Sequence, residues 1–179
     1  MGLRGGRRGR VVAWGAGVAA VAVALAVALV AVRPWQAAEA DALSPAVRDE
    51  LARRTARLLE TAPAGRELLT TGYVPVACAV RPLGTDPPAV TRAADARVVY
   101  VWALCSTVER GAERSGVSVP LVVTPGPPTR VRKPVDGAGY TASVRDMFPA
   151  RLHGAALSDL DWTGGLEPAL RARILELSR

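Results

Sequence analysis

The sequence predicts an α+β protein with an N-terminal transmembrane helix. After it we expect a small domain in which one amphipathic helix packs on a three- to four-stranded antiparallel sheet, with short C-terminal helices. Three observations lead to this prediction: a charge-free stretch over residues 11–32, helical apolar spacing from Ser44 onward, and several strand-like segments in succession. Strands that cluster between helices are typical of α+β domains rather than of alternating βαβ units.

The charge-free stretch has the length and the flanking residues of a membrane anchor. A helix over residues 11–32 spans about 33 Å, close to the roughly 30 Å of a bilayer's hydrocarbon core. Four arginines lie within residues 1–10, and only Arg33 follows the stretch closely. Because basic residues stay on the cytoplasmic side, we expect a cytoplasmic tail (1–10), one span through the lipid bilayer of the cell membrane (11–32), a linker (33–43) and an extracytoplasmic domain (44–179).

A cleaved secretory signal is the alternative interpretation of the same stretch. Small-x-small sites occur at Ala38-Glu39-Ala40 and Ala40-Asp41-Ala42, so cleavage near Ala40 would give a secreted protein. The apolar stretch is longer than the about 7–15 residues of a usual signal core, which favours an uncleaved single-pass signal anchor. Both interpretations place the domain outside the cytoplasm.

The positive charge of the chain does not indicate a nucleic-acid partner. Of the net charge of +7, five positive charges lie in residues 1–33, which contain no acidic residue. Residues 34–179 carry 18 basic and 16 acidic groups and are nearly neutral. Nucleic-acid binding requires basic groups concentrated on one face. The abundance of Ala, Val, Arg and Gly, with a single lysine, is typical of a GC-rich bacterial genome.

The domain should begin with a helix. Ser44 is a suitable N-cap and Pro45 a suitable first helical residue. Apolar residues then recur at helical spacing, and Pro63 with Gly65 should end the helix; the apolar positions are Val47, Leu51, Leu58 and Leu59.

Strand-like segments rich in β-branched and aromatic residues follow this helix. Residues 73–81, 97–109 and 116–124 are predicted strands, and residues 129–133 could form a fourth. Pro120 indicates a sheet edge or a bulge, because proline cannot donate to the ladder. A short helix should follow over residues 140–147, ended by Pro149, and a last helix should begin near Glu167 with Leu170, Ile174 and Leu177 on one face.

The two cysteines, Cys78 and Cys105, are predicted to form a disulfide. Both lie in predicted strands of a domain that we place in an oxidising compartment. If they face each other, Val80 pairs with Ala103 and Val76 with Thr107, which keeps the apolar residues of both strands on one face. Closing this loop should stabilise the fold by about 3–4 kcal/mol on the chain-entropy model.

The sequence contains no convincing catalytic, metal-binding or cofactor-binding pattern. His153 is the sole histidine, and no G-x-S-x-G motif accompanies it. Asp159 and Asp161 resemble the start of a calcium loop, but its twelfth position is Leu170 instead of a carboxylate. The G-x-G at Gly137 lacks a third glycine and a βαβ context. We therefore predict no catalytic residue, no metal and no cofactor.

The strand over residues 97–109 is apolar on both faces. Tyr100, Trp102 and Leu104 lie on the face opposite Cys105. Either the C-terminal segment, with Phe148, Leu157, Leu160 and Trp162, covers this face, or the face lines a groove for an apolar ligand or a partner protein. Tyr100, Trp102 and Leu104 are thus the candidate ligand-binding residues.

These observations favour a membrane-anchored extracytoplasmic domain that binds a partner protein or an apolar ligand in the cell envelope. An enzyme is not favoured, but the alternative is a secreted or envelope hydrolase whose acidic residues converge only in the fold. The acidic residues available for such a site are Asp95, Glu109, Asp136, Asp146, Asp159 and Asp161.

Overall fold

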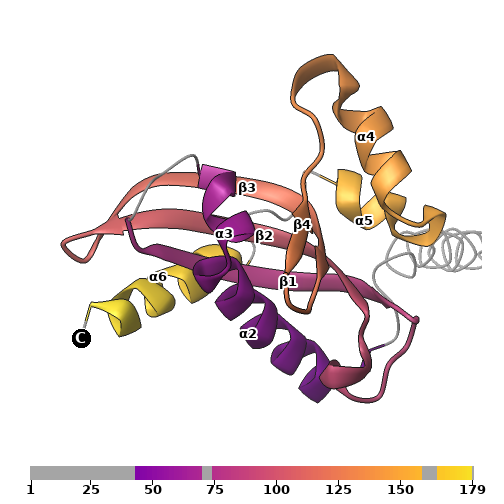
Figure 1. Cartoon of the computed structure of the whole chain (residues 1–179), viewed down its shortest axis with the longest axis horizontal. Helices are drawn as coiled ribbons and strands as arrows, with labels where there is room; N and C mark the ends of the chain where they lie inside the picture. Colours follow the sequence, from indigo (N-terminus) through magenta and orange to yellow (C-terminus); the bar gives the residue numbers. More distant parts are fainter. Residues whose placement is uncertain (1–42, 70–73, 159–164, 179) are drawn as a thin grey trace, which may run out of the picture. The chain divides into compact units, whose positions relative to one another are not determined.

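Four antiparallel strands in sequence order form the centre of the domain, in a computed structural model that describes residues 43–69, 74–158 and 165–178 (Figure 1). The strands are β1 (Val76–Asp86), β2 (Val98–Glu109), β3 (Ala112–Thr124) and β4 (Arg130–Arg132). The predicted transmembrane helix over residues 11–32 lies outside the described residues. Within the described ranges, no helix is both long enough and apolar enough to cross a bilayer.

The predicted pairing of β1 with β2 is confirmed in its first half. Val76 faces Thr107, Cys78 faces Cys105 and Val80 faces Ala103. The register then shifts at Leu83, so that β1 continues to Asp86, beyond the predicted strand end at Arg81. A bulge of this kind inserts one extra residue and lets the strand bend.

The amphipathic helix forms as its local sequence predicts. α2 (Pro45–Thr61) begins at the N-cap Ser44, whose hydroxyl accepts a hydrogen bond from the amide of Val47 at 3.4 Å. The short helix α3 (Pro63–Arg66) and a 3₁₀ turn (Glu67–Leu69) follow. The buried stripe of α2 packs on one face of the sheet, where it meets the apolar side chains of β1, β2 and β3; its members are Val47, Leu51, Ala56 and Leu59.

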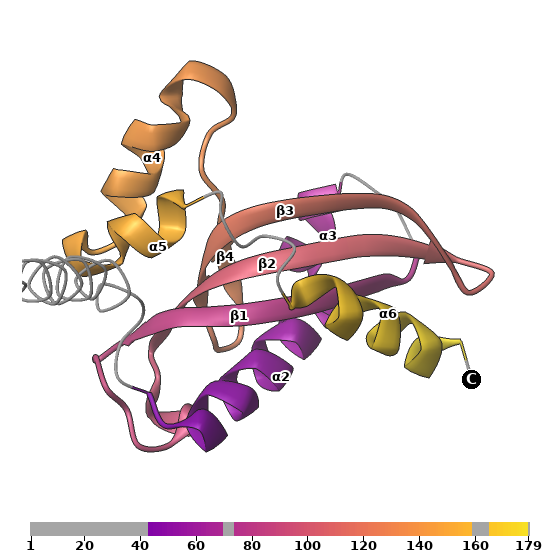
Figure 2. The same cartoon turned by 180° about the vertical axis from the view of Figure 1, so that it is seen from behind.

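The C-terminal helices cover the opposite face of the sheet. They are α4 (Tyr140–Met147), α5 (His153–Leu157) and α6 (Leu166–Leu177), and Figure 2 shows α6 beside β1. α4 has the predicted bounds, and α6 buries Leu170 and Ile174 as predicted. Leu177, at the end of the same apolar face of α6, is 43% exposed.

The sheet therefore separates two apolar clusters, one under α2 and one under α4–α6. This arrangement explains why β2 is apolar on both faces.

Pro120 lies on β3, which pairs with β4 only from Val122 to Thr124. In the described part of the chain Pro120 is thus on a sheet edge, as its missing N–H group predicts.

Candidate functional site

The predicted disulfide between Cys78 and Cys105 is present, at the centre of the β1–β2 pair. Both residues are buried in the cluster under α2, and their Cα atoms are 4.1 Å apart. The amide of Cys78 donates to Glu60 Oε1 at 3.0 Å, so this N–H group points away from β2. The two cysteines therefore occupy a non-hydrogen-bonded pair of the antiparallel ladder, where side chains are closest.

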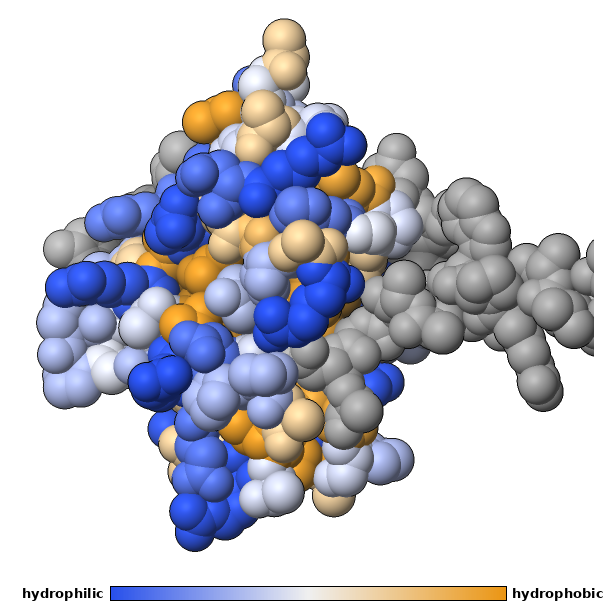
Figure 3. All heavy atoms as spheres, turned by 90° about the vertical axis from the view of Figure 1, so that its right-hand side faces the viewer, coloured by the Kyte–Doolittle hydropathy of each residue, from blue (hydrophilic) through white to orange (hydrophobic). Residues whose placement is uncertain are grey.

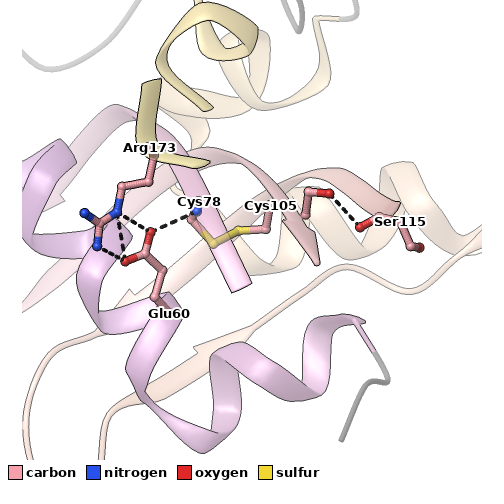
Figure 4. The surroundings of a disulfide bond; sticks show 6 residues. Glu60, Cys78, Cys105, Ser115 and Arg173 are labelled. Carbon is pink, nitrogen blue, oxygen red and sulfur yellow. Dashed lines mark hydrogen bonds and ion pairs between the residues drawn. A yellow bond between two sulfur atoms is a disulfide. The ribbon is translucent and has the colours of Figure 1, made fainter. Parts of the chain in front are cut away.

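Glu60 joins three elements of the fold beside this disulfide (Figure 4). Its carboxylate lies at the end of α2, is 6% exposed, and accepts hydrogen bonds from the β1 backbone and from Arg173 of α6. The guanidinium Nη2 of Arg173 is 2.7 Å from Glu60 Oε2, and Nη1 is 2.8 Å from Glu176. Hydrogen bonds to Glu60 and then Glu176 raise the pKa of Arg173 above its ordinary value.

The Glu60–Arg173 contact was not predicted from the sequence. The two residues are 113 positions apart, and no local pattern relates them. The sequence gives one indication that Glu60 is buried, because Glu60 directly follows Leu58 and Leu59, near the apolar stripe of α2. A charged residue at such a position needs a partner when the helix packs.

The three candidate ligand-binding residues lie together under the C-terminal helices. Trp102 is 5% exposed, and its Nε1 donates to the hydroxyl of Ser118 at 2.8 Å. Leu104 is buried in the same cluster, and the half-buried Tyr100 has its ring centroid 5.5 Å from that of Phe148. Ligand binding by Tyr100, Trp102 and Leu104 stays a prediction. Of the side chains expected to cover this face, Leu160 and Trp162 lie outside the described residues.

The imidazole of His153 contacts backbone carbonyl groups at the end of α4. Its Nε2 lies 2.8 Å from the carbonyl oxygen of Phe148 and 3.1 Å from that of Arg145. Both carbonyls belong to the C-terminal end of α4, whose last carbonyl groups lack helical partners. The imidazole therefore links the end of α4 to the start of α5.

Four of the acidic residues considered for a hydrolase form ion pairs in the described part of the chain. Each pairs with a different basic residue: Asp95 with Arg92, Glu109 with Arg114, Asp136 with Lys133 and Asp146 with Arg132. Across residues 43–69, 74–158 and 165–178, no three His, Cys, Asp or Glu side chains form a group that could hold a metal ion. Asp159 and Asp161 lie outside these ranges.

A hollow of about 510 Å³ lies between the end of α2 and the β3–β4 turn. Its walls are mainly apolar and proline-rich, and Glu67 is the one charged residue among them; the lining residues are Leu58, Thr61, Ala62, Pro63, Ala64, Glu67, Gly126, Pro127, Pro128 and Thr129. The volume is within the range of small-ligand sites. The sequence predicted the end of the helix at Pro63 and a break between the strands 116–124 and 129–133, but it could not place these two segments side by side.

A second hollow lies at the start of β1. It is lined by Val74, Pro75, Thr107, Val108, Glu109, Arg110 and Arg114. On the face drawn in Figure 3, hydrophobic residues reach the surface in several separate places between hydrophilic ones.

No protein-family model matches the chain, and no curated protein or solved structure matches it either.

Proposed function

We propose that this chain is a membrane-anchored binding protein of the cell envelope. In this proposal residues 11–32 cross the membrane once, and the domain on the outer side binds an apolar group of a partner protein or small ligand. The observation that carries the proposal is the disulfide between Cys78 and Cys105, buried in the core of the domain. Such bonds persist in oxidising compartments and are rare in the cytosol.

The hollow beside α2 is the binding site that we propose. Leu58 and Pro63 supply apolar surface on one side, and Pro127 and Pro128 supply it on the other. Glu67 at the margin would favour a basic group next to the apolar group of the ligand, because opposite charges attract at short range. The predicted aromatic face at Tyr100, Trp102 and Leu104 is the alternative site of the same function.

Thiol labelling of the full chain, denatured directly from cells, tests the placement. A maleimide should react with Cys78 and Cys105 only when a reductant is added, and the chain should stay with the membrane pellet at alkaline pH. Two thiols that react without a reductant in the denatured protein would contradict an oxidising compartment. The intact mass of the chain separates the anchor from the secreted alternative, since cleavage near Ala40 removes the N-terminal segment.

Binding at the hollow can be tested with a naphthalenesulfonate dye whose fluorescence rises in apolar surroundings. Ala64→Trp should fill the hollow and lower the dye signal of the full chain, because Ala64 lines it. Ala172→Trp on the exposed side of α6 is the matched control. An equal dye signal for both variants and the unmodified chain would contradict binding at this site.

A further inference from the structure

The polar side chains that line the hollow beside α2 can accept hydrogen bonds but have no free proton to donate. They belong to Thr61, Glu67 and Thr129. The hydroxyl of Thr61 donates to the carbonyl oxygen of Arg57 at 2.7 Å, and that of Thr129 donates to the carbonyl oxygen of Gly126 at 3.0 Å. A hydroxyl has one proton and two lone pairs, so each threonine offers a ligand only lone pairs. A carboxylate is likewise an acceptor only.

The other lining residues do not compensate for these acceptors. Three of them are prolines, which have no backbone N–H group. Among the described residues that line the hollow, none is a lysine, an arginine or a histidine. Arg66, the residue before Glu67, directs its Nη2 to the carbonyl oxygen of Thr61 at 3.1 Å and does not line the hollow. The lining therefore offers lone pairs and one negative charge, with no cation to balance them.

The carboxylate of Glu67 has no ion-pair partner within the described ranges. Glu67 directly follows α3, and its backbone N–H group donates to carbonyl oxygens of that helix, while its side chain is exposed at the margin of the hollow. A negative charge that no residue neutralises attracts a cationic ligand and repels an anionic one. The charge of the lining thus selects among apolar ligands by the sign of their polar group.

We propose that the hollow beside α2 binds a small organic cation, a primary ammonium group on an apolar stem. This inference rests on the proposed function of the same hollow and names the chemical class of its ligand. The stem lies on Leu58 and the prolines, and the ammonium group, which carries donors only, faces Glu67 with the threonine oxygens as further acceptors. The volume of about 510 Å³ suits a small molecule, which is why we infer a free amine rather than a protein segment as the occupant.

Three ligands that share an aromatic stem and differ in charge test this proposal. Phenylethylammonium is the cation, phenylethanol is neutral and phenylpropanoate is the anion. Saturation-transfer NMR with the full chain in detergent measures the dissociation constant of each, and the same detergent without protein gives the background. The cation should bind most tightly and phenylethanol more weakly, and phenylpropanoate should show no saturable binding.

Substitutions separate the effect of the charge from that of the apolar surface. Glu67→Gln should weaken binding of the cation about twofold to fivefold, as expected for an exposed ion pair, and leave binding of phenylethanol unchanged. Glu50→Gln is the matched control, because it removes an exposed carboxylate of α2 that does not line the hollow. Ala64→Trp should abolish binding of both ligands. An unchanged melting temperature shows that each variant is folded.

The outcomes distinguish a wrong ligand class from a wrong binding site. If Ala64→Trp abolishes binding of phenylethanol, but the cation has no advantage over it or keeps the advantage in Glu67→Gln, the ligand class is wrong and the apolar site stands. If no ligand binds in a way that Ala64→Trp abolishes, both proposals are wrong. If Nα-acetyl-lysine N-methylamide binds more tightly than phenylethylammonium, the occupant is a lysine side chain of a partner protein, and the free amine is wrong.

Discussion

The contact between Glu60 and Arg173 gives the sharpest test of the fold. Replacing Arg173 by Met removes the cation but leaves a carboxylate that is 6% exposed. Removing one partner of a buried ion pair costs about 3–5 kcal/mol, because the remaining charge stays desolvated. Arg173 itself is 29% exposed. We therefore expect the lower end of this range, about 3 kcal/mol, for Arg173→Met.

Urea denaturation of the full chain in detergent, followed by tryptophan fluorescence, measures this loss. The denaturation midpoint should fall while the slope stays constant, which indicates a change in stability alone. Arg171→Met is the matched control, because Arg171 is on the same helix and pairs with Glu167 at the surface, with 73% of its side chain exposed. An exposed pair contributes about 0–1 kcal/mol, so this control should change little.

A second substitution separates the charge effect from lost packing. Glu60→Gln removes the buried negative charge but keeps an oxygen that can accept the amide of Cys78. In the Arg173→Met background it should recover about 1–2 kcal/mol, since the uncompensated charge is gone. The reasoning is refuted if Arg173→Met and Arg171→Met lose the same stability, or if Glu60→Gln makes the Arg173→Met protein still less stable.

Three further predictions follow from local features. Cys105→Ala should lower the free energy of unfolding by about 3–4 kcal/mol, measured by urea denaturation, because the unfolded chain gains freedom. Gly65→Ala should lower the melting temperature, since its Cβ would collide with the α2 backbone, whereas Gly154→Ala meets nothing and should be tolerated. Hydrogen bonding from Arg92 lowers the pKa of Asp95. The small stabilisation from Asp95 is therefore present above its unfolded pKa and lost as pH falls through the folded value, and carboxyl NMR of Arg92→Gln should show the Asp95 pKa rising.

Each of these predictions has a clear contrary result. Cys105→Ala and the fully reduced parent should have equal unfolding midpoints. A midpoint of the variant at or above that of the oxidised parent would contradict the stabilising role of the bond. Gly65→Ala melting at the parent temperature would contradict the close backbone approach. An Asp95 pKa that does not change in Arg92→Gln would show that the hydrogen bond does not form in solution.

The sequence by itself was sufficient to predict the features that neighbouring residues determine. The start of α2 follows from Ser44 and Pro45, since capping depends on residues three positions apart. The pairing of Cys78 with Cys105 follows from their being the two cysteines of the sequence, and strand alternation is consistent with it, because this register keeps both apolar sets on the same face. The membrane placement of residues 11–32 is also a sequence-based prediction, and the topology experiments above address it.

Tertiary structure decided what depends on contacts between distant segments. β1 continues past the bulge at Leu83 to Asp86, beyond its predicted end, and there it stays paired with residues 98–100 of β2. The ion pair of Glu60 with Arg173 and the hollow beside α2 both join segments that are far apart in the chain. Local propensity and periodicity carry no information about such pairs, because the chain must fold before these side chains meet.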